Sequence, residues 1–395
     1  MALTRRGFVR TAGIGVSGVL TSSWIGARGR EHSVWSAFEP TLSAVEPGQI
    51  VLASNENPLG PGRTVMAAVQ AAFGEGGRRP GRYSGSSREL IEAIAAKQKV
   101  KPENVVLGCG STQILRSATH LFTAKDKPLV GTMPTYEECA GYAEMMGHPV
   151  RPVALDAEFK LDLNRLADAA KGAGLVFYCN PNNPTATYVG ARATREFLAQ
   201  VARESPETTI LIDEAYFDYV TDADHDTHIP VAVDNPRVIV ARTFSKAYGM
   251  AGLRMGYAVG HPETIKKMAE WDGGSGTSSL NVLALHAGIA AIQQDASYTA
   301  AERARNKEVR DFTMKWFGDR GMKPTDAQAN FLFVNIGRPA KEFRDACRAK
   351  GVLVARDFPP FEKTHCRLSF GTIEEMKKAV AVFDHVLGRK STAAA

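Results

Sequence analysis

The chain has 395 residues, 44% of them hydrophobic and 23% charged, a balance typical of a globular protein long enough for two domains. The formal net charge is +6, but the first thirty residues hold five arginines and no acid, which leaves +1 for the rest. The basic balance therefore gives no reason to expect nucleic-acid binding. Five cysteines without paired spacing argue against a zinc site or a disulfide framework, and we expect no metal.

Residues 1–30 are predicted to be a signal segment rather than part of the fold. The sequence TRRGFVR at residues 4–10 is a twin-arginine pattern, and a weakly apolar run follows at residues 12–20. This arrangement resembles a twin-arginine export signal, so we expect a periplasmic or secreted protein. The alternative is a disordered basic leader on a cytoplasmic protein. Glycines and serines make the run too weakly apolar to span a bilayer, and no other segment is suited to do so.

The next predicted elements are a short strand at residues 49–53 and two helices. The strand ends in the turn-rich sequence SNENPLGP, residues 54–61. Apolar residues at helical spacing then predict helices near residues 65–73 and 90–95. A basic, glycine-rich loop that contains Tyr83 separates the two helices.

From residue 105 onward, strand, turn and helix patterns alternate. This alternation indicates an α/β fold with a mostly parallel sheet and helices on both faces. Most polar clusters follow the ends of predicted strands, where open α/β sheets bind ligands. The predicted strands are residues 105–107, 129–132, 175–179, 209–212, 237–241 and 255–259.

The pattern changes after the glycines of residues 273–276. Long helical patterns cover residues 280–317, and short strands at 331–334 and 366–370 alternate with helices. We expect a smaller α/β domain here that also takes in the N-terminal strand. The predicted organisation is a signal segment (1–30), an N-terminal segment packing with the small domain (31–75), a large domain (76–275) and the small domain (276–395).

Lys246 is the residue on which the functional prediction depends. It lies just past the strand at residues 237–241, with Thr243 and Ser245 before it and Arg254 eight residues after it. Burial or nearby positive charge makes a lysine amine nucleophilic enough to attack an aldehyde. Hydroxyl groups and an arginine can hold a phosphate. Pyridoxal phosphate requires this combination, whereas a lysine standing alone in a loop would simply be solvated.

A second anion site is predicted at residues 108–112, GCGST, between a strand and a helix. Glycines and hydroxyl residues at a helix N-terminus let backbone N–H groups converge on an anion. The alternative is a tight turn with an N-cap.

Taken together and in order, the motifs of residues 50–385 resemble the fold-type I pyridoxal-phosphate enzymes, class I/II aminotransferases, and among them the histidinol-phosphate aminotransferase family. The resemblance implies an aspartate aminotransferase-like large domain and a homodimeric, pyridoxal-phosphate-dependent transaminase. It would move an amino group between an L-amino acid and a 2-oxo acid by a ping-pong mechanism. The motifs are NENP (55–58), RY (82–83), PTY (134–136), NNPT (182–185), DEAY (213–216), TFSK (243–246), Arg254 and CRLSFGT (366–372).

The resemblance, supported by chemistry, implies roles around the cofactor ring. Lys246 would bind the cofactor as a Schiff base and then carry a proton to and from the substrate α-carbon. Asp213 ends a buried strand, where its carboxylate needs a cation, and the ring nitrogen would supply it. Asn183 and Tyr216 would hydrogen-bond the phenolic oxygen of the ring. Tyr136 would stack on the ring face.

The phosphate and the substrate would bind to further residues by the same resemblance. Tyr83 would reach the phosphate of the neighbouring subunit, and Arg367 would bind the substrate α-carboxylate with Asn183 beside it. The phosphate site within one subunit would consist of Gly110, Ser111, Thr112, Thr243, Ser245 and Arg254. As alternatives, Tyr136 and Tyr216 could be core aromatics, Arg367 a surface arginine and Asp213 a helix N-cap.

Three features depart from the family pattern. Ala186 replaces the glycine of an Asn-Pro-Thr-Gly turn, and we expect that turn to be reshaped because alanine disfavours positive φ. Phe38 stands near the place of a substrate-binding tyrosine, and the loop at residues 271–279 lacks the usual sequence. Arg356, however, stands where the family places an arginine against the substrate phosphate.

Two other functions remain open from the sequence. A decarboxylase of the same fold is one, because the sequence does not fix which substrate bond lies perpendicular to the ring. A non-catalytic cofactor-binding module is the other, since related domains occur in transcription regulators.

Overall fold

The computed structural model describes residues 46–74, 79–82, 87–271, 280–294 and 296–388. All of them belong to one compact unit, residues 40–395. The predicted signal segment, Phe38, Tyr83 and most of the loop at residues 271–279 lie outside the described residues.

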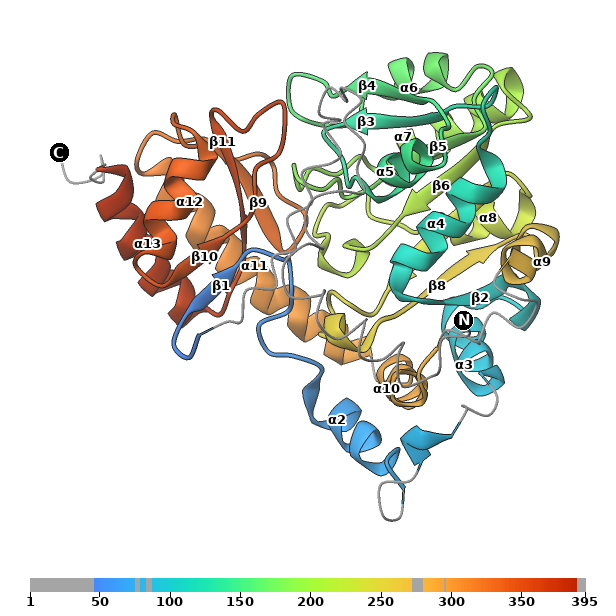
Figure 1. The fold of residues 1–395 in the computed structure, drawn as a ribbon, viewed down its shortest axis with the longest axis horizontal. Helices are drawn as coiled ribbons and strands as arrows, with labels where there is room; N and C mark the ends of the chain where they lie inside the picture. Colours follow the sequence, from blue (N-terminus) through green and yellow to red (C-terminus); the bar gives the residue numbers. More distant parts are fainter. Residues whose placement is uncertain (1–45, 75–78, 83–86, 272–279, 295, 389–395) are drawn as a thin grey trace, which may run out of the picture. The chain divides into compact units, whose positions relative to one another are not determined.

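A seven-stranded sheet with the order β2-β8-β7-β6-β5-β3-β4 forms the centre of the larger part (Figure 1). Strand β8 is antiparallel to β2 and β7, and the other neighbouring pairs are parallel. The prediction of a mostly parallel sheet is therefore confirmed. In chain order the strands are β2 (Val105–Cys109), β3 (Leu129–Met133), β4 (Val150–Ala154), β5 (Leu175–Cys179), β6 (Thr209–Asp213), β7 (Val238–Thr243) and β8 (Met255–Gly260).

Helices cover this sheet. Every residue of β5, β6, β7 and β8 is buried, as expected for strands covered on both faces. The helices are α2 (Gly62–Ala71), α3 (Arg88–Gln98), α4 (Gly110–Phe122), α5 (Glu138–Met145), α6 (Leu163–Ala169), α7 (Ala191–Glu204), α8 (Ile229–Asp234), α9 (Pro262–Trp271) and α10 (Val282–Ile292). Short 3-10 turns are η2 (Arg79–Gly81), η3 (Pro102–Asn104), η4 (Phe217–Tyr219) and η5 (Ala251–Leu253).

The remaining elements surround a second core. Strand β1 (Ile50–Leu52) pairs in parallel with β10 (Val352–Val354), and β9 (Phe331–Asn335) pairs antiparallel with β11 (His365–Ser369). Phenylalanines dominate the packing between these strands and the helices: Phe317, Phe331, Phe343 and Phe383 are all fully buried. The helices are α11 (Ala296–Gly318), α12 (Ala340–Arg348) and α13 (Ile373–Leu387), the last beginning at the predicted Thr372–Glu375 capping box.

Helices α2 and α10 pack with the core of the large sheet. Val65 and Val69 of α2, and Ala284 and Leu285 of α10, belong to the core of the large sheet. Helices α2 and α10 contact one another, so both lie with that sheet. The boundaries near residues 75 and 275 stay a prediction.

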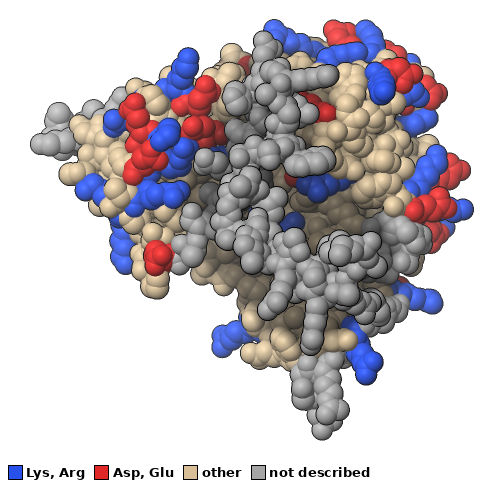
Figure 2. Space-filling view, viewed as in Figure 1, with Lys and Arg blue, Asp and Glu red and all other residues tan. Residues whose placement is uncertain are grey.

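Charged side chains of both signs are interspersed on the face shown in Figure 2. Within the described part of the chain, no helix combines the length and the apolar character needed to cross a bilayer.

Candidate active site

The C-terminal ends of β5, β6 and β7 bring the predicted residues to one edge of the large sheet. Cys179 and Ala241 pair with Asp213 from either side, so the polar segments that follow these strands begin at the same level. Asn183 lies beyond β5, and Lys246 lies three residues beyond β7. The parallel order of the sheet therefore makes neighbours of motifs that are far apart in the sequence.

Asp213 is a buried carboxylate at the end of β6. Its side chain is 3% exposed, and Oδ1 accepts the N–H of Ala215 at 3.2 Å. Burial raises the pKa of Asp213 to about 7, although the Ala215 N–H and the charge of Lys246 work in the opposite direction. No arginine, lysine or histidine of the described residues forms an ion pair with it. A cation bound beside Asp213 would therefore restore its ionised form.

Lys246 is half-buried, and its amine has an environment suited to a nucleophile. Its Nζ donates to the carbonyl of Ser54 at 3.2 Å and lies 5.5 Å from the centre of the Tyr216 ring. Burial and the positive charge of Arg367 lower the pKa of Lys246 to about 8, against the opposing effect of Glu56. A useful fraction of the amine is therefore neutral near physiological pH.

Two tyrosines of the site keep their protons. Burial raises the pKa of Tyr216, whose hydroxyl accepts a hydrogen bond from Nδ2 of Asn55 at 3.1 Å. The Tyr216 ring meets Phe331 edge-on, with 5.0 Å between ring centres. Burial also raises the pKa of Tyr136, which is hydrogen-bonded to Thr112. Both hydroxyls are therefore available as donors at neutral pH.

Arg254 joins the two predicted anion-binding segments. Its guanidinium makes long contacts with the hydroxyls of Thr112, at 3.4 Å, and Ser245, at 3.5 Å. Gly110 opens helix α4 with a φ of 70°, and a Cβ atom there would lie 2.3 Å from Nη2 of Arg254. The N-terminus of a helix of this length presents free N–H groups and a favourable dipole to an anion.

The rest of this pocket wall is also close-packed. A Cβ on Gly256 would lie 2.4 Å from the backbone nitrogen of Ser111, and the N–H of Ser245 donates to the hydroxyl of Thr243 at 3.1 Å. Arg254 thus lies close to Gly110 and to the hydroxyls of Thr112 and Ser245. The residues fit a phosphate group.

Arg367 is a buried guanidinium without a carboxylate partner among the described residues. It is 8% exposed, donates from Nη1 to Oδ1 of Asn183 at 2.7 Å, and donates from Nη2 to the carbonyl of Ala53. Its Nε is buried and has no hydrogen-bond acceptor. Burial lowers the pKa of Arg367 to about 10, and nearby Arg356 adds to this effect. A carboxylate ligand would supply the missing acceptor and counter-charge.

Arg356 lies next to Arg367 but already has an anionic partner. Its Nη2 donates to the carboxylate of Glu137, at the start of helix α5, and Nη1 donates to the carbonyl of Asp357 at 2.9 Å. The ring of Phe358 lies between the two arginines, 4.5 Å from Cζ of Arg356 and 4.7 Å from that of Arg367. A charge pair and an aromatic ring therefore border Arg367.

The turn that carries Ala186 is not reshaped as expected. Ala186 adopts a φ of 61°, the left-handed conformation that glycine would take, and its N–H donates to the carbonyl of Asn182 at 2.7 Å. Its own carbonyl accepts the N–H of Gln328 at 2.7 Å. These two backbone hydrogen bonds hold the turn against a conformational cost of roughly 1–2 kcal/mol.

Sequence reasoning missed the structural importance of residues 53–57. This segment contacts Lys246 through Ser54, Arg367 through Ala53, and Tyr216 through Asn55. The motif NENP was recognised, but nothing in a linear pattern shows which distant side chains it will meet.

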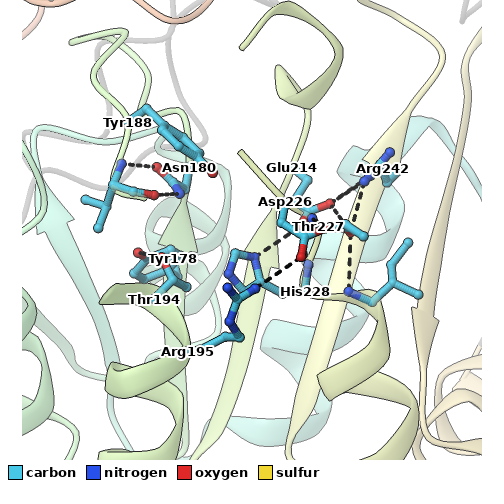
Figure 3. Close-up of polar contacts among 12 residues, drawn as sticks. Tyr178, Asn180, Tyr188, Thr194, Arg195, Glu214, Asp226, Thr227, His228 and Arg242 are labelled. Atoms are coloured by element: carbon cyan, nitrogen blue, oxygen red, sulfur yellow. Dashed lines mark hydrogen bonds and ion pairs between the residues drawn. The ribbon is translucent and has the colours of Figure 1, made fainter. Parts of the chain in front are cut away.

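A buried ion pair behind the site was also missed. Arg242, at the end of β7, donates to Oε2 of Glu214, which directly follows Asp213 (Figure 3). Thr227 and the backbone of His228 donate to the same carboxylate. Glu214 and Arg242 each neighbour a predicted site residue, and this adjacency of opposite charges is the signal that could have suggested the pair.

The chain is similar to known proteins over most of its length. Residues 47–383 match the family model described as aminotransferase class I and II. A histidinol-phosphate aminotransferase of Moorella thermoacetica is 36% identical over 340 residues, which cover 86% of this chain and 85% of that protein.

Solved structures are similar over nearly the whole chain. A histidinol-phosphate aminotransferase from Sinorhizobium meliloti, in complex with pyridoxal-5'-phosphate, is 25% identical with a TM-score of 0.78, and the match covers 92% of this chain and 99% of that one. An aspartate aminotransferase from Thermus thermophilus with maleate is 22% identical with a TM-score of 0.73, covering 86% and 91%. The latter likeness confirms the predicted fold.

Proposed function

The chain belongs to the class I and II aminotransferase family and is a pyridoxal-phosphate-dependent aminotransferase, and from this premise we propose how its residues carry out amino transfer. The observation that carries the proposal is the buried, cation-free Asp213 at the same sheet edge as the low-pKa amine of Lys246. Asp213 would pair with the ring nitrogen, and Lys246 would hold the cofactor and accept the proton of the substrate α-carbon. The bound cofactor supplies an electron sink for that carbon.

The other residues bind and orient. Arg254, which contacts the hydroxyls of Thr112 and Ser245, would hold the phosphate at the N-terminus of helix α4. Arg367 would bind the carboxylate of the 2-oxo acid and of the L-amino acid. Tyr136, Asn183 and Tyr216 would hold the ring.

The test uses the purified full-length protein with added pyridoxal phosphate. Wild type is expected to show a cofactor band near the border of the visible and ultraviolet ranges, which an amino donor bleaches and a 2-oxo acid restores. Lys246→Ala should no longer attach the cofactor covalently and should lose turnover. A wild-type protein without the band would refute the proposal, and carbon dioxide release without any need for a 2-oxo acid would select the decarboxylase instead.

For the amino donor, we propose a histidinol-phosphate-like amine. Several relatives carry the name histidinol-phosphate aminotransferase, and a phosphate monoester calls for a second guanidinium beside Arg367. Arg356 is placed to provide it once it releases Glu137. Glu137→Gln should then raise kcat/KM for histidinol phosphate several-fold, and Arg356→Leu should lower it about 10- to 100-fold, the equivalent of one charged hydrogen bond.

An aromatic L-amino acid is a second candidate. It is favoured by Phe358 beside Arg367 and by the charge pair that already neutralises Arg356. With phenylalanine or tyrosine as donor, Glu137→Gln and Arg356→Leu should leave kcat/KM within about twofold of wild type. The same two variants therefore separate the two donors.

We also propose a homodimer in which Tyr83 reaches the partner's phosphate site. Support comes from the family resemblance and from Leu59, Met66 and Phe73, large apolar residues that recur every seven positions along α2 and its flanks and are 61%, 42% and 42% exposed. Met66→Glu should yield monomers in light scattering.

Mixing Tyr83→Phe with Lys246→Ala should restore part of the activity, because each hybrid dimer has one native site. Failure of this mixture to recover activity, while the dimer persists, would refute the shared site.

Export by the twin-arginine route is a further proposal. It is supported by Arg5 and Arg6 with the weakly apolar run that follows them. In cell fractionation, the wild-type chain should reach the exported fraction and the double variant Arg5→Lys/Arg6→Lys should stay in the cytoplasm. Equal distribution of both proteins would contradict export by this route.

A further inference from the structure

Asn55 is the polar residue through which the N-terminal segment reaches the cofactor site. It follows strand β1 and has a left-handed backbone, with a φ of 54° that asparagine tolerates better than most residues. It is 1% exposed. A buried amide in this conformation is held only if its surroundings fix it, and they do so from three sides.

The first side is Ser369, two residues beyond Arg367 on β11. The backbone N–H of Asn55 donates to Oγ of Ser369 at 2.8 Å, and the same hydroxyl donates to Oδ1 of Asn55 at 2.8 Å. The second side is Asn330, whose Nδ2 donates to the carbonyl of Asn55 at 2.9 Å. The side-chain oxygen and the backbone of Asn55 are both occupied by these contacts.

The third side is Tyr216. With Oδ1 turned to Ser369, the amide nitrogen of Asn55 faces the tyrosine hydroxyl and donates to it at 3.1 Å. An amide NH₂ group can only donate, so the tyrosine oxygen must accept here. The single proton of the hydroxyl is consequently directed elsewhere.

We propose that Asn55 is a positioning residue that directs the Tyr216 hydroxyl proton toward the phenolic oxygen of the bound cofactor. The inference rests on the proposed function, which places Tyr216 at that oxygen. By accepting from Asn55, the hydroxyl also becomes a stronger donor, because hydrogen bonds in a chain polarise one another. Asn55 does not touch the reacting atoms and acts only through Tyr216.

The predicted effect is spectroscopic. A hydrogen bond to the phenolic oxygen favours its anionic form and so lowers the pH at which the band of the lysine-bound cofactor changes. Tyr216→Phe should raise this transition. Asn55→Gly, which removes the amide but keeps the left-handed backbone unstrained, should raise it by about 0.5 to 1 pH unit, the equivalent of one hydrogen bond.

A second variant turns the amide into an acceptor. In Asn55→Asp a carboxylate oxygen replaces the NH₂ group, accepts the tyrosine proton and draws it away from the cofactor. The transition should rise at least as far as in Asn55→Gly. In the double variant Asn55→Gly/Tyr216→Phe it should equal that of Tyr216→Phe alone, because Asn55 acts through the hydroxyl.

Asn104 provides the matched control. It is a buried asparagine whose Nδ2 donates to the carbonyl of Gly260 at 2.9 Å, away from the site. Asn104→Ala should lower the melting temperature without moving the transition.

The experiment is a pH titration of absorbance on each holoenzyme, with melting temperatures measured in parallel. An Asn55→Gly transition equal to wild type while Tyr216→Phe moves would overturn the role of Asn55 and leave the proposed function intact. If Tyr216→Phe also leaves the transition unmoved, the placement of Tyr216 fails and the role of Asn55 with it. Additive shifts in the double variant would likewise overturn the inference.

Discussion

Arg242 donates from both Nε and Nη2 to one oxygen of Glu214, at 2.8 and 2.6 Å, and this pair joins the end of β7 to the end of β6 (Figure 3). Glu214 follows Asp213, and Arg242 precedes Thr243. The pair is therefore adjacent in sequence to two of the predicted cofactor-binding residues. Its guanidinium also covers the ring of Phe217, with Cζ 3.7 Å from the ring centre.

Removing one partner of this pair is expected to destabilise the protein strongly. Glu214→Leu leaves a buried guanidinium unpaired, which typically costs about 3–5 kcal/mol, whereas Glu214→Leu/Arg242→Met should lose less because no charge stays behind. Urea unfolding of the apoprotein at pH 7 measures both. A double variant less stable than Glu214→Leu would contradict this explanation.

The same carboxylate makes the protein sensitive to acid. Arg242 and the contacts from His228 hold the pKa of Glu214 at about 2 despite its burial, below the ordinary 4.5. A folded-state pKa that is depressed contributes stability above pH 4.5, and this contribution is lost as the pH falls toward 2. The unfolding free energy of wild type should therefore fall faster than that of Glu214→Gln over this interval. Parallel curves would show that Glu214 is not the titrating group.

Protonation of Asp213 should give the stability of the apoprotein the opposite dependence on pH. Burial raises the pKa of Asp213 from 3.8 to about 7, so apoprotein stability is lost as the pH rises from 3.8 through 7. Asp213→Asn should therefore make the apoprotein more stable than wild type at pH 8, with little difference at pH 4. It should also weaken cofactor binding, since the ring nitrogen loses its counter-ion. Melting curves of the wild-type and Asp213→Asn apoproteins at pH 4 and pH 8 test this expectation. A variant less stable than wild type at pH 8 would refute it.

Attachment of the cofactor should follow the protonation of Lys246. Burial and Arg367 lower the pKa of this amine to about 8, so the rate at which added pyridoxal phosphate reacts should rise with pH and level off above about 8. Arg367→Gln removes one of the causes that lower the pKa of Lys246, so it should move the inflection to higher pH. Stopped-flow absorbance measures the attachment rate against pH for the wild-type and Arg367→Gln apoproteins. An inflection near the ordinary lysine value of 10.5 in wild type would contradict the expectation.

Gly110 and Gly172 allow a matched test of the phosphate site. Both have a φ of 70°, but a Cβ at Gly110 would lie 2.3 Å from Arg254, while nothing lies within 4 Å of one at Gly172. Each alanine variant should lose about 1–2 kcal/mol of stability from backbone strain. Only Gly110→Ala should also weaken cofactor binding, measured by titration of the absorbance band. Equal affinities in the two variants would exclude Gly110 from the phosphate site.

Much of the site could be predicted because it follows strand ends. Asp213 and Lys246 each come after a recognisable apolar run, and the parallel order of a sheet places such ends together. Asn55 could not be assigned in this way. Its partners Tyr216 and Ser369 lie 161 and 314 positions away, and no local pattern encodes contacts over that distance.

Ala186 shows a second reason why sequence-based prediction fails. A propensity rule expects alanine to leave the left-handed region, but two backbone hydrogen bonds keep it there. Local preference amounts to only a kcal/mol or two, and tertiary contacts can exceed it. The predicted reshaping of the turn was therefore wrong, although alanine does disfavour this conformation.

The contact between Arg367 and the carbonyl of Ala53 spans 314 positions of the chain. A ribosome that has made the whole seven-stranded sheet has therefore still not supplied the residues that complete the substrate site. Strand β1 likewise has to wait for β10 before it gains a partner. A nascent chain is consequently able to build its cofactor platform well before it is able to recognise an amino acid.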